Sequence, residues 1–329
     1  MKGARAIENR IEMLTKSKAL SLLLARLPEK HGKRLFLEGE LHKEDAGKRG
    51  EQRLRHKFKE FYLEEEFLVL WNVNLNIGEW KVQMDGLLLT KNAAIIIESK
   101  NISGKIHFNQ ETEEFYRIDD NGEKTVFDDP RIQLEKHCRF LAAWLKLKKI
   151  KLPVDGIVVF TAKQCEFMSK PPGKRICKTY QMNQYLYRVL KDHPQKLAPL
   201  KLNKIKNLIE LHSNPYKHTP LCDTYHINSL ELKTGVFCTN CQQLSMERIR
   251  KSWNCVLCSH RDSQAHRLAI QEYFSLVGHQ LENQHLRWFC KIDSVHTASR
   301  LLVESGLPFT GAKKNRKYSL ENLDDAAEK

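Results

Sequence analysis

A run of three isoleucines that ends in two charged residues constrains the fold of this chain more than any other feature. The segment is Ala94–Lys100, with isoleucine at positions 95–97, followed by Glu98, Ser99 and Lys100. A continuous β-branched run predicts a strand that is buried on both faces. Because side chains alternate along a strand, Glu98 and Lys100 point to the same face. Opposite charges at the end of a buried strand are unfavourable unless they pair or bind a ligand.

A second apolar stretch upstream, Val82–Leu89, carries a lone acid, Asp85. The intervening Lys91-Asn92 suits a tight turn, so we expect an antiparallel hairpin. If its register brings Asp85 beside Glu98, the two carboxylates can hold a hard cation such as Mg²⁺. Lys100 would then orient or deprotonate an attacking water. Metal-assisted phosphodiester hydrolysis needs such a set of groups. The alternative is that Glu98 and Lys100 form an ordinary solvated ion pair.

A charged helix precedes these strands. Gly47 and Gly50 are expected to open it, and Glu51 shares one face with Leu54 and Phe58. Glycine at these positions permits close approach of the backbone to a neighbour or a phosphate. Glu51 therefore either supports a site or pairs with Arg55 four residues on.

The rest of this region alternates strands and helices. A turn at Asp120-Asn121-Gly122 predicts a hairpin, and Asp129 and Pro130 suit the N-cap and first residue of a helix. A buried strand is expected over Pro153–Phe160. Strands, a crossover helix and a returning strand predict an α/β core with a mixed sheet. The other expected strands are 67–73, 104–108, 115–118 and 125–127.

Four short motifs occur in a fixed order, at Gly47, Gly50 and Glu51; Gln83 and Asp85; Glu98 and Lys100; Pro130 and Gln133. Their order resembles the NERD (nuclease-related domain) family, a branch of the restriction-endonuclease-like superfamily. The resemblance covers roughly residues 40–160, with Met84 and Asp129 departing from the usual pattern. It implies a restriction-endonuclease-like mixed sheet with flanking helices, and Mg²⁺-dependent cleavage of DNA. It also implies that Asp85 and Glu98 bind the metal, that Lys100 activates water, and that Glu51 and Gln133 support the site.

Four of the nine cysteines have the spacing of a zinc ribbon. Two Cys-x-x-Cys pairs, thirteen residues apart, supply four thiolates for a closed, structural Zn²⁺ site. The alternative is four unrelated cysteines. The ligands would be Cys238, Cys241, Cys255 and Cys258. We interpret Cys222, His226, His260 and His266 as non-ligands, and Cys138, Cys165, Cys177 and Cys290 as packing residues.

Residues 263–319 predict three amphipathic helices and a basic hairpin, which together resemble a winged helix-turn-helix. In that arrangement the third helix enters the major groove, and hairpin cations contact phosphates. The alternative is a small helical packing module with a solvated, charged loop. The nucleic-acid-binding candidates are His296, Thr297 and Arg300 on the helix, and Lys313, Lys314, Arg316 and Lys317 in the hairpin.

Net charge and cysteine usage narrow the possible binding partners and the expected cellular compartment. A formal charge of +15 favours nucleic acid, with an anionic membrane surface second. No apolar stretch approaches the ~18 residues of a membrane span, and no secretory segment is evident, so we expect a cytoplasmic protein. The predicted parts are N-terminal amphipathic helices (1–45), a nuclease-related domain (46–165), a helical extension and linker (166–235), a zinc ribbon (236–260), a winged-helix-like module (263–319) and a disordered acidic tail (320–329).

Taken together, the sequence predicts a metal-dependent nuclease, with DNA favoured over RNA by the resemblance and Zn²⁺ and Mg²⁺ as its metals. One alternative is a non-catalytic nucleic-acid-binding or adaptor protein with a degenerate nuclease-like domain. A second is a protein scaffold that carries a zinc module. Only the scaffold lacks a steep dependence of DNA affinity on salt.

Overall fold

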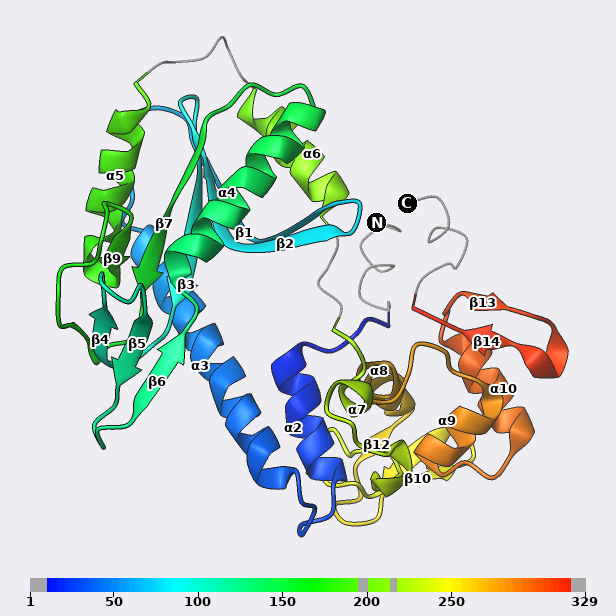
Figure 1. Ribbon diagram of the computed structural model, residues 1–329. Helices are drawn as coiled ribbons and strands as arrows, with labels where there is room; N and C mark the ends of the chain where they lie inside the picture. Colours follow the sequence, from blue (N-terminus) through cyan, green and yellow to red (C-terminus); the bar gives the residue numbers. More distant parts are fainter. Residues whose placement is uncertain (1–10, 195–200, 214–217, 321–329) are drawn as a thin grey trace. The chain divides into compact units, whose positions relative to one another are not determined.

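The computed structural model describes residues 11–194, 201–213 and 218–320 (Figure 1). The chain divides into two compact units, one of residues 45–216 and one that joins residues 1–44 to residues 217–329. We call them the nuclease-like unit and the ribbon unit. The predicted acidic tail lies outside the described residues, apart from Leu320. The finer boundaries expected within each unit stay predictions.

A five-stranded mixed sheet forms the centre of the nuclease-like unit, with strand order β1-β2-β3-β7-β9. Strands β1, β2 and β3 pair antiparallel, whereas β3, β7 and β9 run parallel. The predicted mixed α/β core is therefore confirmed. The strands are β1 (Leu68–Ile77), β2 (Trp80–Leu89), β3 (Ala94–Lys100), β7 (Val154–Phe160) and β9 (Ile176–Lys178).

Helices cover both faces of this sheet (Figure 1). On one face Ile96 packs with α4 (Pro130–Leu147) and α6 (Leu202–His212). On the other face Ile95 and Ile97 pack with α3 (Arg34–Phe58) and α5 (Met182–Asp192), which the short η1 (Thr179–Gln181) precedes. All three isoleucines are fully buried, so the prediction of a strand buried on both faces is confirmed.

A second sheet of four short strands has the order β6-β5-β4-β8. The predicted hairpin around Gly122 is confirmed, because β5 and β6 pair antiparallel and Gly122 has a φ of 84°. Strands β8 and β9 have three residues each, too few to show a periodic pattern. The strands are β4 (Gly104–Phe108), β5 (Phe115–Ile118), β6 (Lys124–Phe127) and β8 (Cys165–Phe167).

The expectation that Gly47 and Gly50 open a helix is wrong. Helix α3 begins at Arg34 and runs through both glycines. Each glycine costs about 1 kcal/mol against alanine, and tertiary packing outweighs that amount. A Cβ at Gly50 would lie 2.6 Å from Thr161 Oγ1 and 2.9 Å from the Cβ of Asn101. Gly50 therefore lets α3 approach the residue that follows β3, whereas the space around Gly47 is open.

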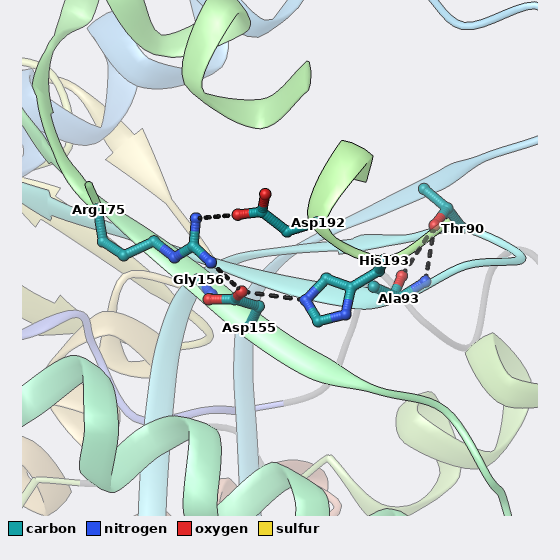
Figure 2. A network of polar contacts seen from close by, with 7 residues as sticks. All are labelled: Thr90, Ala93, Asp155, Gly156, Arg175, Asp192 and His193. Atoms are coloured by element: carbon teal, nitrogen blue, oxygen red, sulfur yellow. Dashed lines mark hydrogen bonds and ion pairs between the residues drawn. The ribbon is translucent and has the colours of Figure 1, made fainter. Parts of the chain in front are cut away.

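An ion-pair network holds the start of β7 to the end of α5 (Figure 2). Asp155 Oδ2 lies 2.6 Å from Arg175 Nη2 and 3.0 Å from His193 Nε2, and Arg175 also bonds Asp192 at 3.2 Å. In the parallel ladder Asp155 pairs with Ile95, three residues before Glu98. The network thus lies at the opposite end of β3 from Glu98 and stabilises the scaffold.

The ribbon unit joins an N-terminal helix, α2 (Lys16–Arg26), to the C-terminal part of the chain. The remaining elements are short: α7 (Leu221–Thr224), η2 (Ser229–Glu231), β10 (Met246–Ile249), β11 (Ser252–Cys255), β12 (Arg261–Asp262), α8 (His266–Leu276), α9 (Asn283–Cys290), α10 (Val295–Glu304), β13 (Phe309–Thr310), η3 (Lys313–Asn315) and β14 (Lys317–Tyr318). In the described part of the chain, no helix combines the length and apolarity of a membrane span.

Candidate active site and metal centre

The hairpin of β2 and β3 places Asp85 across from Glu98. Gly86 pairs with Ile97 in the antiparallel ladder, and Asp85 and Glu98 are the next residues on the two strands. On the other side of β2, the ladder with β1 is interrupted opposite Asp85, at Asn72, which has a φ of 53°. A non-glycine residue in this left-handed conformation marks a local distortion. The distortion therefore lies beside Asp85 in the sheet.

Ser99 holds the carboxylate of Asp85. The backbone N–H and the hydroxyl of Ser99 both donate to Asp85 Oδ2, each over 2.8 Å. The two bonds fix one oxygen of the acid. Among the described residues, none donates a recorded hydrogen bond to the other oxygen, Oδ1.

Glu98 is a buried acid, with 2% of its surface exposed. His137 Nδ1 lies 2.7 Å from Glu98 Oε1, and Gln133 Nε2 lies 3.4 Å from Oε2. Burial raises the pKa of Glu98, and the charge of Asp85 raises it further, whereas His137 and Lys100 act in the opposite direction. The net direction is upward, so the site stabilises the carboxylate of Glu98 less well than water does.

Gln133 bridges Glu98 and Lys100. Lys100 Nζ donates to Gln133 Oε1, while the amide nitrogen of Gln133 faces Glu98. Gln133 and His137 lie one turn apart on α4, so they reach the same face of the sheet. Asp129 fixes the start of this helix as the predicted N-cap, since its side chain accepts from the backbone N–H of Arg131 at 2.8 Å. Helix α4 thus carries two of the groups that surround Glu98.

Glu51 has the ion pair that the alternative interpretation expected, because its Oε2 lies 3.7 Å from Arg55 Nη2. It also follows Gly50, which packs against Asn101 directly after β3. The structure therefore brings Asp85, Glu98, Lys100 and Gln133 together. A supporting role for Glu51 stays a prediction.

Sequence reasoning missed Ser99 and His137. Ser99 faces away from Glu98 on an ideal strand, so the alternation of side chains gave no signal for its contact with Asp85. His137 carried a usable signal: it lies four residues after Gln133, on the helical stripe that continues to the buried Phe140.

The donor set at Asp85 and Glu98 fits a hard divalent cation. Magnesium prefers carboxylate oxygens and is commonly bound through one or two of them. Burial is the main cause of the raised pKa of Glu98, and the nearby charge of Asp85 adds to it, so a cation bound here would stabilise both carboxylates. Asp85 and Glu98 are the residues that would hold it.

The four ribbon cysteines form a compact cluster whose sulfur atoms all lie within 4.8 Å of one another. The Sγ atoms are 3.6 Å apart for both Cys238–Cys258 and Cys241–Cys255. A tetrahedral zinc with Zn–S bonds of about 2.3 Å holds its sulfurs about 3.8 Å apart. The cluster therefore fits the predicted zinc ribbon, whose strands β10, β11 and β12 form a three-stranded sheet.

Local hydrogen bonds favour a thiolate at Cys255, whereas burial raises the pKa of Cys238 in the same cluster to about 11. Burial by itself opposes ionisation of Cys255, yet bonds from Ser245 Oγ and from the backbone N–H groups of Leu257 and Cys258 lower its pKa to about 6. Cysteines elsewhere behave differently, because burial raises the pKa of Cys138, Cys177, Cys222 and Cys290 to about 12 and that of Cys165 to about 11. The prediction that Cys138, Cys165, Cys177 and Cys290 are packing residues agrees with their places in the hydrophobic cores.

The C-terminal segment contains the predicted helices in the predicted order, α8, α9 and α10, followed by the β13–β14 hairpin. Ser294 caps α10 through the backbone N–H of Thr297, and Arg300 lies 3.7 Å from Glu304. Arg316 stacks over the Phe309 ring. The exposed candidates for nucleic-acid binding are His296, Arg300, Lys313, Lys314 and Lys317, whereas Thr297 and Arg316 are half-buried.

Comparison with protein families identifies the domain that contains Asp85 and Glu98. Residues 46–161 match the family described as nuclease-related domain, NERD. This chain contains a nuclease-related domain. The matched segment includes Glu51, Asp85, Glu98, Lys100 and Gln133 and covers about a third of the chain. No curated protein and no solved structure matches the chain.

Proposed function

We propose that this nuclease-related protein hydrolyses phosphodiester bonds in DNA with the help of Mg²⁺. The observation that carries the proposal is the buried, incompletely neutralised Glu98, which lies across from Asp85 inside the matched domain. A bound Mg²⁺ would neutralise phosphate charge and lower the pKa of a water molecule.

Each polar residue around Glu98 has a task in this proposal. Asp85 and Glu98 bind the cation. Lys100 orients the attacking water and offsets negative charge that develops in the reaction, and Gln133 keeps its amine in place through the hydrogen bond to Nζ. Glu51 supports the site from α3.

Purified, zinc-loaded full-length protein provides the test. We expect cleavage of duplex DNA with Mg²⁺ and none when the divalent cation is omitted. The Lys100→Met variant should cleave about 10²–10³-fold more slowly, the range for loss of one group that stabilises developing negative charge. Asp85→Asn should lose cleavage as well. Lys151→Met, which removes the same charge at an exposed site before β7, is the matched control and should leave the rate unchanged.

Cleavage that survives both Asp85→Asn and Lys100→Met would contradict these assignments. DNA binding without any cleavage by the wild-type protein would favour the alternative, a nucleic-acid-binding or adaptor protein with a degenerate nuclease-like domain. Single-stranded DNA and RNA, assayed in parallel, identify the preferred substrate.

We further propose that the zinc ribbon and the C-terminal winged-helix-like module position the DNA, in a protein that acts in the cytoplasm. The +15 charge and the exposed cations of α10 and the β13–β14 hairpin support this role. Replacing Lys313 and Lys314 by alanine should weaken binding uniformly across sequences and flatten the salt dependence by about one unit per lost phosphate contact. An affinity that does not change with salt would instead favour the scaffold alternative.

A further inference from the structure

His137 is a buried polar side chain to which the proposed chemistry gives no task. It is 7% exposed and lies on α4, one turn after Gln133. Its Nδ1 is 2.7 Å from Glu98 Oε1, the shorter of the two recorded hydrogen bonds to this acid. When Glu98 is ionised its oxygens only accept, so Nδ1 then carries the hydrogen in this bond.

The two acids are restrained in the same way. Ser99 occupies Oδ2 of Asp85 through two donors, and His137 occupies Oε1 of Glu98. In each carboxylate the protein fixes one oxygen by its shortest hydrogen bonds, which leaves Oδ1 of Asp85 and Oε2 of Glu98 more available to an ion. Gln133 approaches Oε2 only at 3.4 Å, a weak bond that a ligand can replace.

We propose that His137 is a positioning residue that fixes the carboxylate of Glu98 through Oε1 and so directs Oε2 to the metal position. This inference rests on the proposed function of the site. A group that orients a metal ligand typically changes metal affinity 10–100-fold when it is removed, although it never touches the ion. A histidine that only fills space in the core would leave metal affinity unchanged.

Asparagine and leucine at position 137 provide a matched pair. Their side chains have nearly the same branched shape, and the asparagine amide nitrogen lies close to where Nδ1 of histidine lies. His137→Asn therefore keeps a donor toward Oε1, whereas His137→Leu removes it. His137→Gln keeps an amide but moves it one carbon further from the backbone, and it replaces the leucine variant should that variant fail to fold.

The experiment measures Mn²⁺ affinity of the zinc-loaded full-length protein by calorimetry, with thermal melting as the check on folding. We expect His137→Leu to bind Mn²⁺ about 10–100-fold more weakly than wild type. His137→Asn should recover most of that loss, and His137→Gln should recover less. DNA cleavage at saturating Mn²⁺ should follow the same order, with a smaller spread than at limiting Mn²⁺.

Two results would overturn the role of His137 alone: equal Mn²⁺ affinity for wild type and His137→Leu, or equal losses for the leucine and asparagine variants. Glu98→Gln separates these from failure of the proposed function. If wild type shows no Mn²⁺ binding that Glu98→Gln abolishes, the metal site itself is refuted, and the role of His137 with it.

Discussion

Each unit of this protein buries a glutamate, and the two glutamates differ in what balances their charge. In the ribbon unit, Glu272 is fully buried, and its Oε2 lies 2.6 Å from Nε of Arg26. The same guanidinium donates to the carbonyls of Lys233 and Gly235 and lies 4.1 Å from the centre of the Phe289 ring. Arginine stays charged under all ordinary conditions, so this acid has a permanent internal partner.

Among the described residues, Glu98 in the nuclease-like unit contacts no permanently charged cation, because its partner His137 is charged only when it is protonated. Its recorded hydrogen bonds come from a histidine and an amide, and the amine of Lys100 is directed to Gln133 rather than to Glu98. The neighbouring Asp85 adds a second negative charge. The difference separates a structural acid from a candidate functional one. A buried acid that pairs with an arginine links two segments of the fold, whereas a buried acid without a permanent cation is a candidate ligand for a bound metal ion.

The largest expected contrast is in catalysis. Glu98→Gln should reduce DNA cleavage by about 10³-fold or more, because metal-ion stabilisation of the reaction is worth several kcal/mol. Glu272→Gln, the same change in the other unit, should leave the rate per folded molecule unchanged. Initial cleavage rates of the two variants at saturating Mg²⁺ provide the measurement. A similar loss of rate in both variants would contradict the distinction between the two glutamates.

The next contrast is in stability. Arg26→Met leaves Glu272 buried without its cation, so the free energy of unfolding of the ribbon unit should fall by about 3–5 kcal/mol. Adding Glu272→Met to the same protein should recover most of the loss, since both charges are then absent. Denaturant titration with hydrogen exchange in α8 reports on this unit. The ion pair would lose its assigned role if the single variant were as stable as the double.

A buried histidine in the ribbon unit, His266, should make the stability of that unit depend on pH. Burial lowers the pKa of His266 to about 4, and the charges of Arg248 and Arg267 act in the same direction. In the unfolded chain this histidine binds a proton near pH 6.5, whereas in the folded protein it stays neutral down to about pH 4. The free energy of unfolding is therefore unaffected by His266 above pH 6.5, and it falls by about 3 kcal/mol as the pH drops toward 4. His266→Phe should remove this part of the acid sensitivity. Unfolding curves of wild type and His266→Phe, recorded at saturating zinc over a range of pH, measure this effect. If the stability of the two proteins fell in parallel as the pH dropped, the role of His266 would be refuted.

The smallest contrast is the response to Mg²⁺. At a free concentration of 100 Kd the ion should stabilise the nuclease-like unit by about 2.7 kcal/mol and leave the ribbon unit unaffected. Glu98→Gln should abolish the effect, and Glu272→Gln should retain it. Hydrogen exchange in β3 and α8, with and without Mg²⁺, distinguishes the two units. Equal protection of both would show that the ion acts elsewhere.

The features that sequence predicted are those that depend on neighbouring residues. The buried strand follows from the isoleucine run, the start of α4 from Asp129 and Pro130, and the four-sulfur cluster from two Cys-x-x-Cys pairs. The sequence also predicted the hairpin of β2 and β3 from a short turn, but it left open the register that places Asp85 across from Glu98.

What sequence did not predict depends on contacts between distant segments. The bond from Ser99 to Asp85 lies beside the distortion at Asn72 on a third strand, which no hydrophobic pattern reports. The continuous α3 reflects the packing of Gly50 on Asn101, which outweighs the low helix propensity of glycine. The pair of Arg26 and Glu272 joins residues 246 positions apart, and no spacing rule connects them.

The most direct test of the central claim is the position of a divalent cation in crystals soaked with Mn²⁺. In this account the two carboxylates bind Mn²⁺ through Oδ1 of Asp85 and Oε2 of Glu98. The thiolates of the ribbon prefer zinc, so they should not compete for Mn²⁺. We predict an anomalous Mn²⁺ peak adjacent to both Asp85 and Glu98, and its disappearance in Glu98→Gln crystals. A protein that cleaves DNA while showing no ion at these acids, or the same peak in wild type and Glu98→Gln, would contradict the account.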